Sequence, residues 1–219
     1  MKITWLGHDA FLFETSDGVK ILSDPYESGS YNGAVGYKPI DEVVDVVFCT
    51  HEHADHGAHA QLPGNPHVIL GGGTHEDRGI AFKGINTFHD KTQGSERGEN
   101  TVFVFNIEGL TICHLGDLGH SLTAQHKEQI GTIDLLFVPI GGVYTIDHEE
   151  AWEVVQFLSP KIAVPIHYKT DVLNFPLTDV NTFLRGKSNV QKINASEFEI
   201  STDTLPKILK IVVFKEHKL

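Results

Sequence analysis

The residues with the clearest chemistry lie in one hexapeptide, His51-Glu52-His53-Ala54-Asp55-His56. It follows an apolar, β-branched run at 43–50 that predicts a buried strand. His51 and His53 are two residues apart, so extended backbone points both imidazoles the same way and lets them share one cation. Asp55 and His56 follow a bend and suit a second cation, since imidazole and carboxylate ligands bind zinc at about 2.0–2.2 Å. A solvated polar loop is the alternative, but it needs no such dense run of ligand types.

Other strand-like runs also end in a residue that could complete these sites. His89 could supply a third imidazole to the first site, or be a surface histidine. Asp117 has two carboxylate oxygens and could bridge two cations, or it could cap a helix or turn after Gly116. His167 could close the second site, or be a hydrogen-bonded core histidine. Because sites are usually built on loops at strand ends, the repeated pattern favours one composite centre.

Further polar residues could surround such a centre. Asp24 could accept a hydrogen bond from the second ring nitrogen of a ligand histidine, or it could be a turn residue. Arg97 could bind an anion through paired hydrogen bonds, or be solvated. His8, His114 and His120 could line the pocket and bind a phosphate or carboxylate. Buried, hydrogen-bonded roles fit His8 and His114 equally well.

Short apolar runs separated by turn signals must position these residues. Strands are predicted at 2–6, 10–14, 19–23, 43–50, 67–70, 84–88, 101–106, 110–114, 134–140, 161–166 and 207–214. Helices are predicted at 121–130, 147–158 and 179–186, with Asp147 as the cap of the second. The stretch 27–36 predicts a flexible loop, and the glycines at 71–73 predict a break in the chain. The predicted elements are strands in the first half of the chain and strands mixed with helices in the second half. This order favours a sandwich of two mixed sheets with helices outside over a doubly wound parallel sheet.

The bulk composition limits the class of protein. The chain has 219 residues, of which 40% are hydrophobic and 21% charged, and no linker divides it, so we predict one globular domain over 1–219. The net charge of −12 disfavours nucleic acids and anionic membranes as partners. Cys49 and Cys113 lie in apolar runs, which predicts buried free thiols in a reducing compartment. The N-terminus has no signal-peptide core and no run reaches transmembrane length, which predicts a cytoplasmic protein.

The segment Thr50 to His56 resembles the signature of the metallo-β-lactamase fold superfamily. More closely, the chain is similar to the branch of metal-dependent hydrolases that includes the ascorbate-6-phosphate lactonases. The resemblance covers nearly the whole chain and includes, in the family's order, Trp5-Leu6-Gly7-His8, Ser23-Asp24-Pro25, Phe88-His89-Asp90, Arg97-Gly98-Glu99-Asn100, His114-Leu115-Gly116-Asp117-Leu118-Gly119-His120, Pro139-Ile140-Gly141-Gly142 and Pro165-Ile166-His167-Tyr168.

This resemblance implies an αββα sandwich, an α/β fold with metals at one edge. It implies that one metal takes His51, His53 and His89. The other would take Asp55, His56 and His167, with Asp117 as the bridge. The segment Leu70 to Gly84 departs from the family pattern because it is short and glycine-rich, which leaves the shape of the substrate pocket open.

The expected activity is hydrolysis of a small ester, lactone, phosphodiester or similar small-molecule substrate by a metal-bridging hydroxide. Two cations about 3.5–4 Å apart can share a hydroxide and polarise the bond under attack, while Asp55 or Asp117 accepts a proton. We expect two divalent metal ions with zinc as the default, although manganese, iron or nickel accept overlapping ligands. The alternatives are an iron-dependent redox enzyme similar to the sulfur dioxygenases and a non-catalytic metal- or ligand-binding protein. A homo-oligomer is compatible with the sequence.

Overall fold

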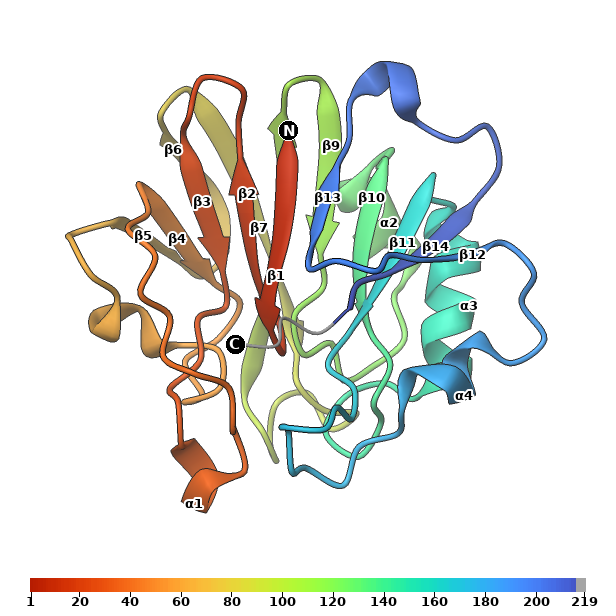
Figure 1. Ribbon diagram of the computed structural model, residues 1–219. Coiled ribbons are helices and arrows are strands. Elements are labelled where there is room, and N and C mark those ends of the chain that lie inside the picture. The colour runs from red at the N-terminus through yellow and green to blue at the C-terminus, as the bar shows by residue number, and fades with distance from the viewer. Residues whose placement is uncertain (216–219) are drawn as a thin grey trace.

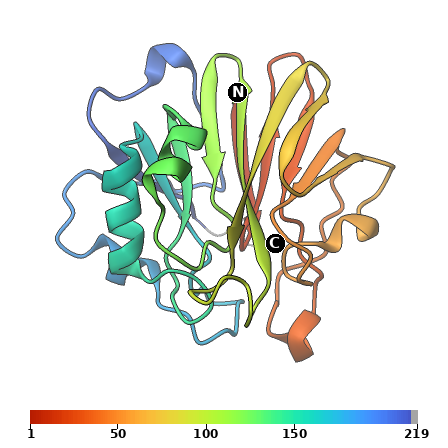
Figure 2. The same ribbon diagram turned by 180° about the vertical axis from the view of Figure 1, so that it is seen from behind.

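The computed structural model describes residues 1–215, whose strands form two mixed β-sheets packed face to face (Figures 1 and 2). The six-stranded sheet has the order β13-β1-β2-β3-β4-β5, and the eight-stranded sheet has the order β12-β14-β11-β10-β9-β8-β7-β6. The strands of the first sheet are β1 (Lys2–Gly7), β2 (Ala10–Glu14), β3 (Lys20–Ser23), β4 (Val46–Cys49), β5 (His67–Leu70) and β13 (Glu197–Glu199). Those of the second are β6 (Gly73–Asp77), β7 (Ile80–Phe88), β8 (Glu99–Ile107), β9 (Leu110–His114), β10 (Leu135–Pro139), β11 (Ile162–Ile166), β12 (Val190–Lys192) and β14 (Lys210–Val213).

The main core lies between the two sheets. Alternate residues of each strand point into it, so Phe11 and Phe13 of β2 meet Phe105 and Phe137 of the second sheet in edge-on ring contacts. The residues between them, such as Leu12, point to the opposite face and are buried in a second cluster. Because both faces of these strands are buried, their sequences are almost continuously apolar.

The outer faces of the sheets are covered differently. On the eight-stranded sheet, α2 (Ala124–Ile130) contacts β7 and α3 (His148–Leu158) contacts β10, while α4 (Val180–Leu184) packs on α3 (Figure 2). The outer face of the six-stranded sheet is covered by loop residues such as Tyr26, Val35 and Leu173. The short turns α1 (Ser30–Gly33), η1 (Ala58–Gln61) and η2 (Thr202–Thr204) complete the assigned elements. The fold is the expected sandwich, with its longer helices on one side.

Several predicted boundaries were wrong. A break in the chain was expected at 71–73 and the next strand only from 84, but β6 and a longer β7 form a hairpin over this stretch, turning at Arg78 and Gly79, which both have positive φ. The exposed, polar residues of β6 hide its period-two pattern. The short strands β12 and β13 were not predicted. The first predicted helix begins only at Ala124, because the Thr123 side chain accepts the amide of His126 and caps it. Asp147 caps α3 as predicted.

Strand direction brings distant polar residues to one edge. β3, β4 and β5 are parallel, and β1 runs with them because it is separated from β3 by one antiparallel strand. In the other sheet, β9, β10 and β11 are parallel and β7 shares their direction for the same reason. The residues that follow these carboxyl ends therefore meet at a common edge: His8, Asp24, His51, His89, Asp117 and His167.

Candidate metal centre

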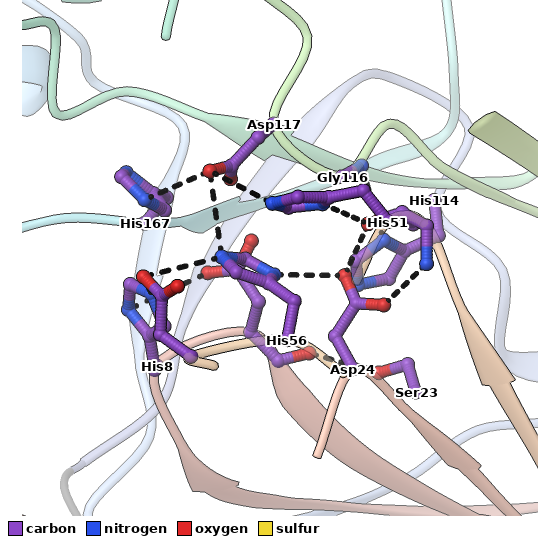
Figure 3. Close-up of polar contacts among 12 residues, drawn as sticks. His8, Ser23, Asp24, His51, His56, His114, Gly116, Asp117 and His167 are labelled. Atoms are coloured by element: carbon purple, nitrogen blue, oxygen red, sulfur yellow. Dashed lines mark hydrogen bonds and ion pairs between the residues drawn. The ribbon is translucent and has the colours of Figure 1, made fainter. Parts of the chain in front are cut away.

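Asp117 lies at the middle of this edge and is 2% exposed. Its Oδ2 atom is 3.3 Å from His167 Nε2, 3.4 Å from His56 Nε2 and 3.8 Å from His51 Nε2 (Figure 3). It also lies 3.0 Å from His89 Nε2. These imidazoles belong to both of the ligand groups expected from the sequence. One carboxylate therefore faces both groups, which is the geometry that a bridging ligand requires.

Hydrogen bonds from the Asn100 side chain hold the loop that carries Asp117. The Asn100 side chain accepts the amide of Asp117 at 3.0 Å and donates to the carbonyl of Leu115 at 2.9 Å and to Thr87 Oγ1 at 2.8 Å. Gly116 has φ of 54°, and a Cβ atom there would lie 2.5 Å from the Thr50 side chain. Only glycine allows this close approach of the two sheets, so the Gly-Asp pair is a packing requirement as well as a site.

The first ligand group is His51, His53 and His89, whose candidate ligand atoms lie within 4.8 Å of one another. The imidazole of His89 donates from Nδ1 to the carbonyl of Tyr144 at 3.0 Å, which leaves Nε2 free of hydrogen and aimed at the centre. His51 Nδ1 contacts Thr50 Oγ1 at 3.1 Å and its Nε2 also faces the centre. The predicted trio is therefore assembled in space.

The second ligand group contains Asp55, His56 and His167, together with His8. His56 Nδ1 lies 3.1 Å from Asp24 Oδ2, and because a carboxylate can only accept, His56 carries a hydrogen on Nδ1, which leaves Nε2 as the nitrogen that can bind a metal once it has no proton. His8 Nε2 lies 3.3 Å from Asp55 Oδ2. Asp24 thus occupies the supporting position that its sequence context suggested.

Backbone strain accompanies this group. His8, Asp24 and His167 have φ of 49°, 37° and 49°, in the left-handed region that residues with a side chain rarely adopt. Each follows directly after a strand and turns its side chain toward the centre (Figure 3). Such conformations cost on the order of 1–3 kcal/mol each and persist where the surroundings require them.

The buried carboxylates of the centre are stabilised by positive charge close to them. Burial would raise the pKa of Asp117, but His167 and His56 hold it well below its usual range. Burial opposes charge on His56, yet the carboxylates of Asp117 and Asp55 outweigh it and raise its pKa well above the ordinary value. His51, by contrast, is held neutral, since burial lowers its pKa to about 3. A proton on His56 thus compensates the buried carboxylates, and metal binding would release it.

Unpartnered atoms show that the residues fit a metal. Among the residues that the structure describes, His51 Nε2, His56 Nε2 and Asp117 Oδ1 are buried and have no hydrogen-bond partner. Leaving a buried polar atom unsatisfied costs about 1–3 kcal/mol. The two imidazole nitrogens face Asp117 Oδ2, and the surrounding donor set of nitrogen and carboxylate atoms suits zinc and related cations.

The remaining sequence candidates are divided between the cavity and its surroundings. Arg97 lines a cavity of about 210 Å³ above the centre, together with His53, Asp55, Tyr31, Tyr144 and Phe175. His114 lies behind the centre, where Nδ1 accepts the amide of Gly116 at 3.2 Å and the ring stacks on Phe137. His120 accepts the amide of Phe88 at 3.2 Å and donates to the carbonyl of Ser121. Neither is among the residues that line this cavity.

Sequence reasoning missed several residues of the site. Tyr31 donates to Asp55 Oδ1 at 3.2 Å, although it lies in the stretch predicted as a flexible loop. Asp9 is fully buried beside His8, and burial raises its pKa to about 8. Phe175 and Tyr144 form part of the cavity wall. The aspartate next to His8 could have been noticed, but no local pattern indicates the aromatic residues.

Comparison with known proteins agrees with this centre. The β-lactamase superfamily domain matches residues 2–167, and the chain therefore belongs to the metallo-β-lactamase superfamily. A UPF0173 metal-dependent hydrolase from Archaeoglobus fulgidus is 31% identical over 208 residues, covering 82% of this chain and 86% of that protein. A UPF0173 protein from Pyrococcus abyssi is 35% identical over 188 residues, covering 78% and 84%.

A solved structure from Thermotoga maritima, assigned to the Zn-dependent hydrolases of the metallo-β-lactamase superfamily, is 39% identical. It superimposes with a TM-score of 0.80 and covers 97% of each chain. Among the described residues, no helix is both long and apolar enough to cross a membrane.

Proposed function

We propose that this chain is a dinuclear metal-dependent hydrolase that acts on a small-molecule ester, lactone or phosphodiester. One observation carries the proposal: a single oxygen of Asp117 lies within 3.8 Å of imidazole nitrogens from both ligand groups. His51, His53 and His89 would hold one ion, and Asp55, His56 and His167 the other, with Asp117 between them. The relatedness to metal-dependent hydrolases supports the reaction class.

When bound, a pair of zinc ions would supply a nucleophilic hydroxide at neutral pH and polarise the carbonyl or phosphoryl oxygen under attack. The overall reaction adds one water, breaks the C–O or P–O bond to the leaving group, and gives an acid and an alcohol. Asp117 Oδ1 is buried and unpartnered, and it can accept the proton that the attacking water loses. Asp55 is the second available carboxylate, and its Oδ1 accepts the Tyr31 hydroxyl.

The Tyr31 hydroxyl helps to position Asp55 for this reaction. It borders the cavity, and burial raises its pKa to about 12, so it stays protonated and donates its one hydrogen to Asp55 Oδ1. His8 holds the other oxygen of Asp55 from the opposite side. The chain therefore positions the Asp55 carboxylate through contacts on both oxygens.

Elemental analysis of protein purified without added metal tests the proposal. We expect close to two metal ions per chain, mainly zinc, and a sharp drop in His53→Ala. The His53 side chain is exposed, so its removal should not unfold the protein. His59→Ala is the matched control, since this nearby histidine lies in η1 outside both ligand groups.

The metal-loaded protein is then assayed against a panel of esters, lactones and phosphodiesters. Sugar-phosphate lactones belong in the panel because of the sequence resemblance to lactonases. A folded protein that carries no metal and takes up none on dialysis against zinc would overturn the proposal. Iron as the bound metal, with activity that requires oxygen, would instead support a redox enzyme.

A further inference from the structure

Arg97 is held beside the metal centre by a specific loop structure. The Asp90 carboxylate accepts the amides of Thr92, Gly94, Glu96 and Arg97 at 2.8–3.1 Å, so it ties the loop between β7 and β8 into one shape. Because Asp90 follows His89 directly, the loop that presents Arg97 is anchored to a candidate metal ligand.

The Arg97 guanidinium is available for an anion. It lies over the Tyr144 ring, 4.7 Å from the ring centroid. In residues 1–215 it makes no ion pair, although the chain is strongly acidic, with a net charge of −12. A guanidinium has five N–H donors in a planar fork, which matches carboxylate and phosphate oxygens.

The charged residues that line the two cavities next to Arg97 indicate which of them an anion would enter. Arg97 borders both the cavity above the centre, of about 210 Å³, and a neighbouring one of about 540 Å³. The larger cavity is also lined by Glu52 and Glu99, which disfavour an anion. In the smaller cavity the carboxylates are Asp55 and Asp117, whose charge bound metals would compensate. The smaller cavity is therefore the one suited to an anionic ligand.

An aromatic wall faces the same space. Phe175 meets Tyr31 and Tyr144 in edge-on contacts, with ring centroids 5.4 and 5.9 Å apart. These rings give the cavity an apolar side opposite its polar floor, an arrangement typical of small-molecule sites. A volume of about 210 Å³ lies below the roughly 300–1,000 Å³ of common small-molecule pockets. The occupant is therefore a small molecule, or the reacting end of a larger one.

We infer that Arg97 determines specificity, by binding a carboxylate or phosphate group of a small substrate whose apolar body packs on Tyr31, Phe175 and Tyr144. As a statement about substrate the inference rests on the proposed hydrolase function. As a statement about binding it does not, because the guanidinium and the aromatic wall are present whether or not turnover occurs.

Binding of matched probes to the zinc-loaded protein tests the inference without turnover. Isothermal titration compares benzoate, phenylphosphonate and the neutral benzamide. We expect benzoate or phenylphosphonate to bind at least tenfold more tightly than benzamide, and the tighter of the two identifies the anion class. Arg97→Met should weaken binding of that anion at least tenfold, about 1.4 kcal/mol. The affinity of Arg97→Lys for that anion should lie between those of the wild type and Arg97→Met, since lysine keeps the charge and loses the paired hydrogen bonds.

Arg185→Met is the control for net charge. Arg185 is exposed at the end of α4, and its replacement removes the same unit of charge far along the chain. If the anions fail to bind at millimolar concentration, or bind equally well to Arg97→Met, the inference is overturned. The second result would mean that the metals alone hold the anion.

A kinetic comparison separates this inference from the proposed function. Mono-4-nitrophenyl glutarate carries a free carboxylate, whereas 4-nitrophenyl butyrate is a neutral ester of similar size. We expect the ratio of their kcat/KM values, anionic over neutral, to fall at least tenfold in Arg97→Met. Anion binding that depends on Arg97 without hydrolysis of any ester, lactone or phosphodiester would refute the hydrolase and leave the binding site standing. Hydrolysis with an unchanged ratio would refute the specificity role alone.

Discussion

Asp24→Asn should change the ring nitrogen that His56 presents to the centre. Asp24 is fully buried and accepts from the Thr50 amide at 2.7 Å, from Thr50 Oγ1 at 2.7 Å and from His56 Nδ1 at 3.1 Å. Asparagine keeps the size and one oxygen, which can still accept the Thr50 amide. Its NH2 group then faces His56 Nδ1, so the imidazole must either shift its hydrogen to Nε2 or leave two donors opposed.

The expected loss follows from this choice. A hydrogen on Nε2 prevents His56 from binding a metal, and keeping it on Nδ1 leaves a buried donor unsatisfied at about 1–3 kcal/mol. We therefore expect one of the two zinc affinities to fall by roughly 5- to 150-fold, which overlaps the range known for supporting residues of metal ligands. The other site depends on His51, His53 and His89, and it should change much less.

Competition with a chromophoric chelator measures both zinc affinities. Urea denaturation of the same samples shows whether the variant is folded. Asp41→Asn is the matched control, because the side chain of this aspartate is exposed and makes no ion pair or hydrogen bond within residues 1–215. If a folded Asp24→Asn protein bound both zinc ions within threefold of the wild type, the assigned hydrogen on His56 Nδ1 would be wrong.

Two further substitutions test the packing around the centre. Gly119→Ala would place a Cβ atom 2.3 Å from the amide nitrogen of Asp90 and 2.3 Å from the carbonyl carbon of His89. We therefore expect urea denaturation to show that the free energy of unfolding falls by at least about 2 kcal/mol, together with weaker zinc binding. Wild-type stability and wild-type zinc binding would contradict this contact. Asp147→Ala removes the side chain that caps α3 through the amides of Glu149 and Glu150. We expect urea denaturation to show that the free energy of unfolding falls by about 1 kcal/mol, with the zinc content unchanged. A loss of zinc would show that this cap and the metal centre are not independent.

The convergence of the candidate ligands on one edge could be predicted in part, because much of the information is local. His51 and His53 follow a strand whose apolar character is visible in the sequence, and extended backbone fixes the relative direction of their side chains. His89 and His167 likewise follow strands. The family resemblance then supplied the grouping that spacing alone left open.

The cavity wall could not be predicted, because its geometry depends on contacts between distant loops. Tyr31 lies in a glycine-rich stretch, and its own φ of 51° turns it toward Asp55. No periodic pattern encodes that turn. His120 shows the converse: it has the composition of a site residue, but a single hydrogen bond to the amide of Phe88 assigns it to the support of the strand that leads to His89.

The loops that form the aromatic wall are linked to each other as well as to the centre. The amide of Gly36 donates to Val172 at 2.9 Å, and the amide of Asn174 donates to Ala34 at 2.7 Å, so the segments of Tyr31 and Phe175 form a short antiparallel pair. The candidate metal ligands, by contrast, follow strands that are anchored in the main core. Changes in the linked loops can therefore reshape the wall while the sheet edge holds the ligands in place. In this fold the reaction would be set by the sheet edge, and the choice of substrate by the paired loops and by Arg97 opposite them.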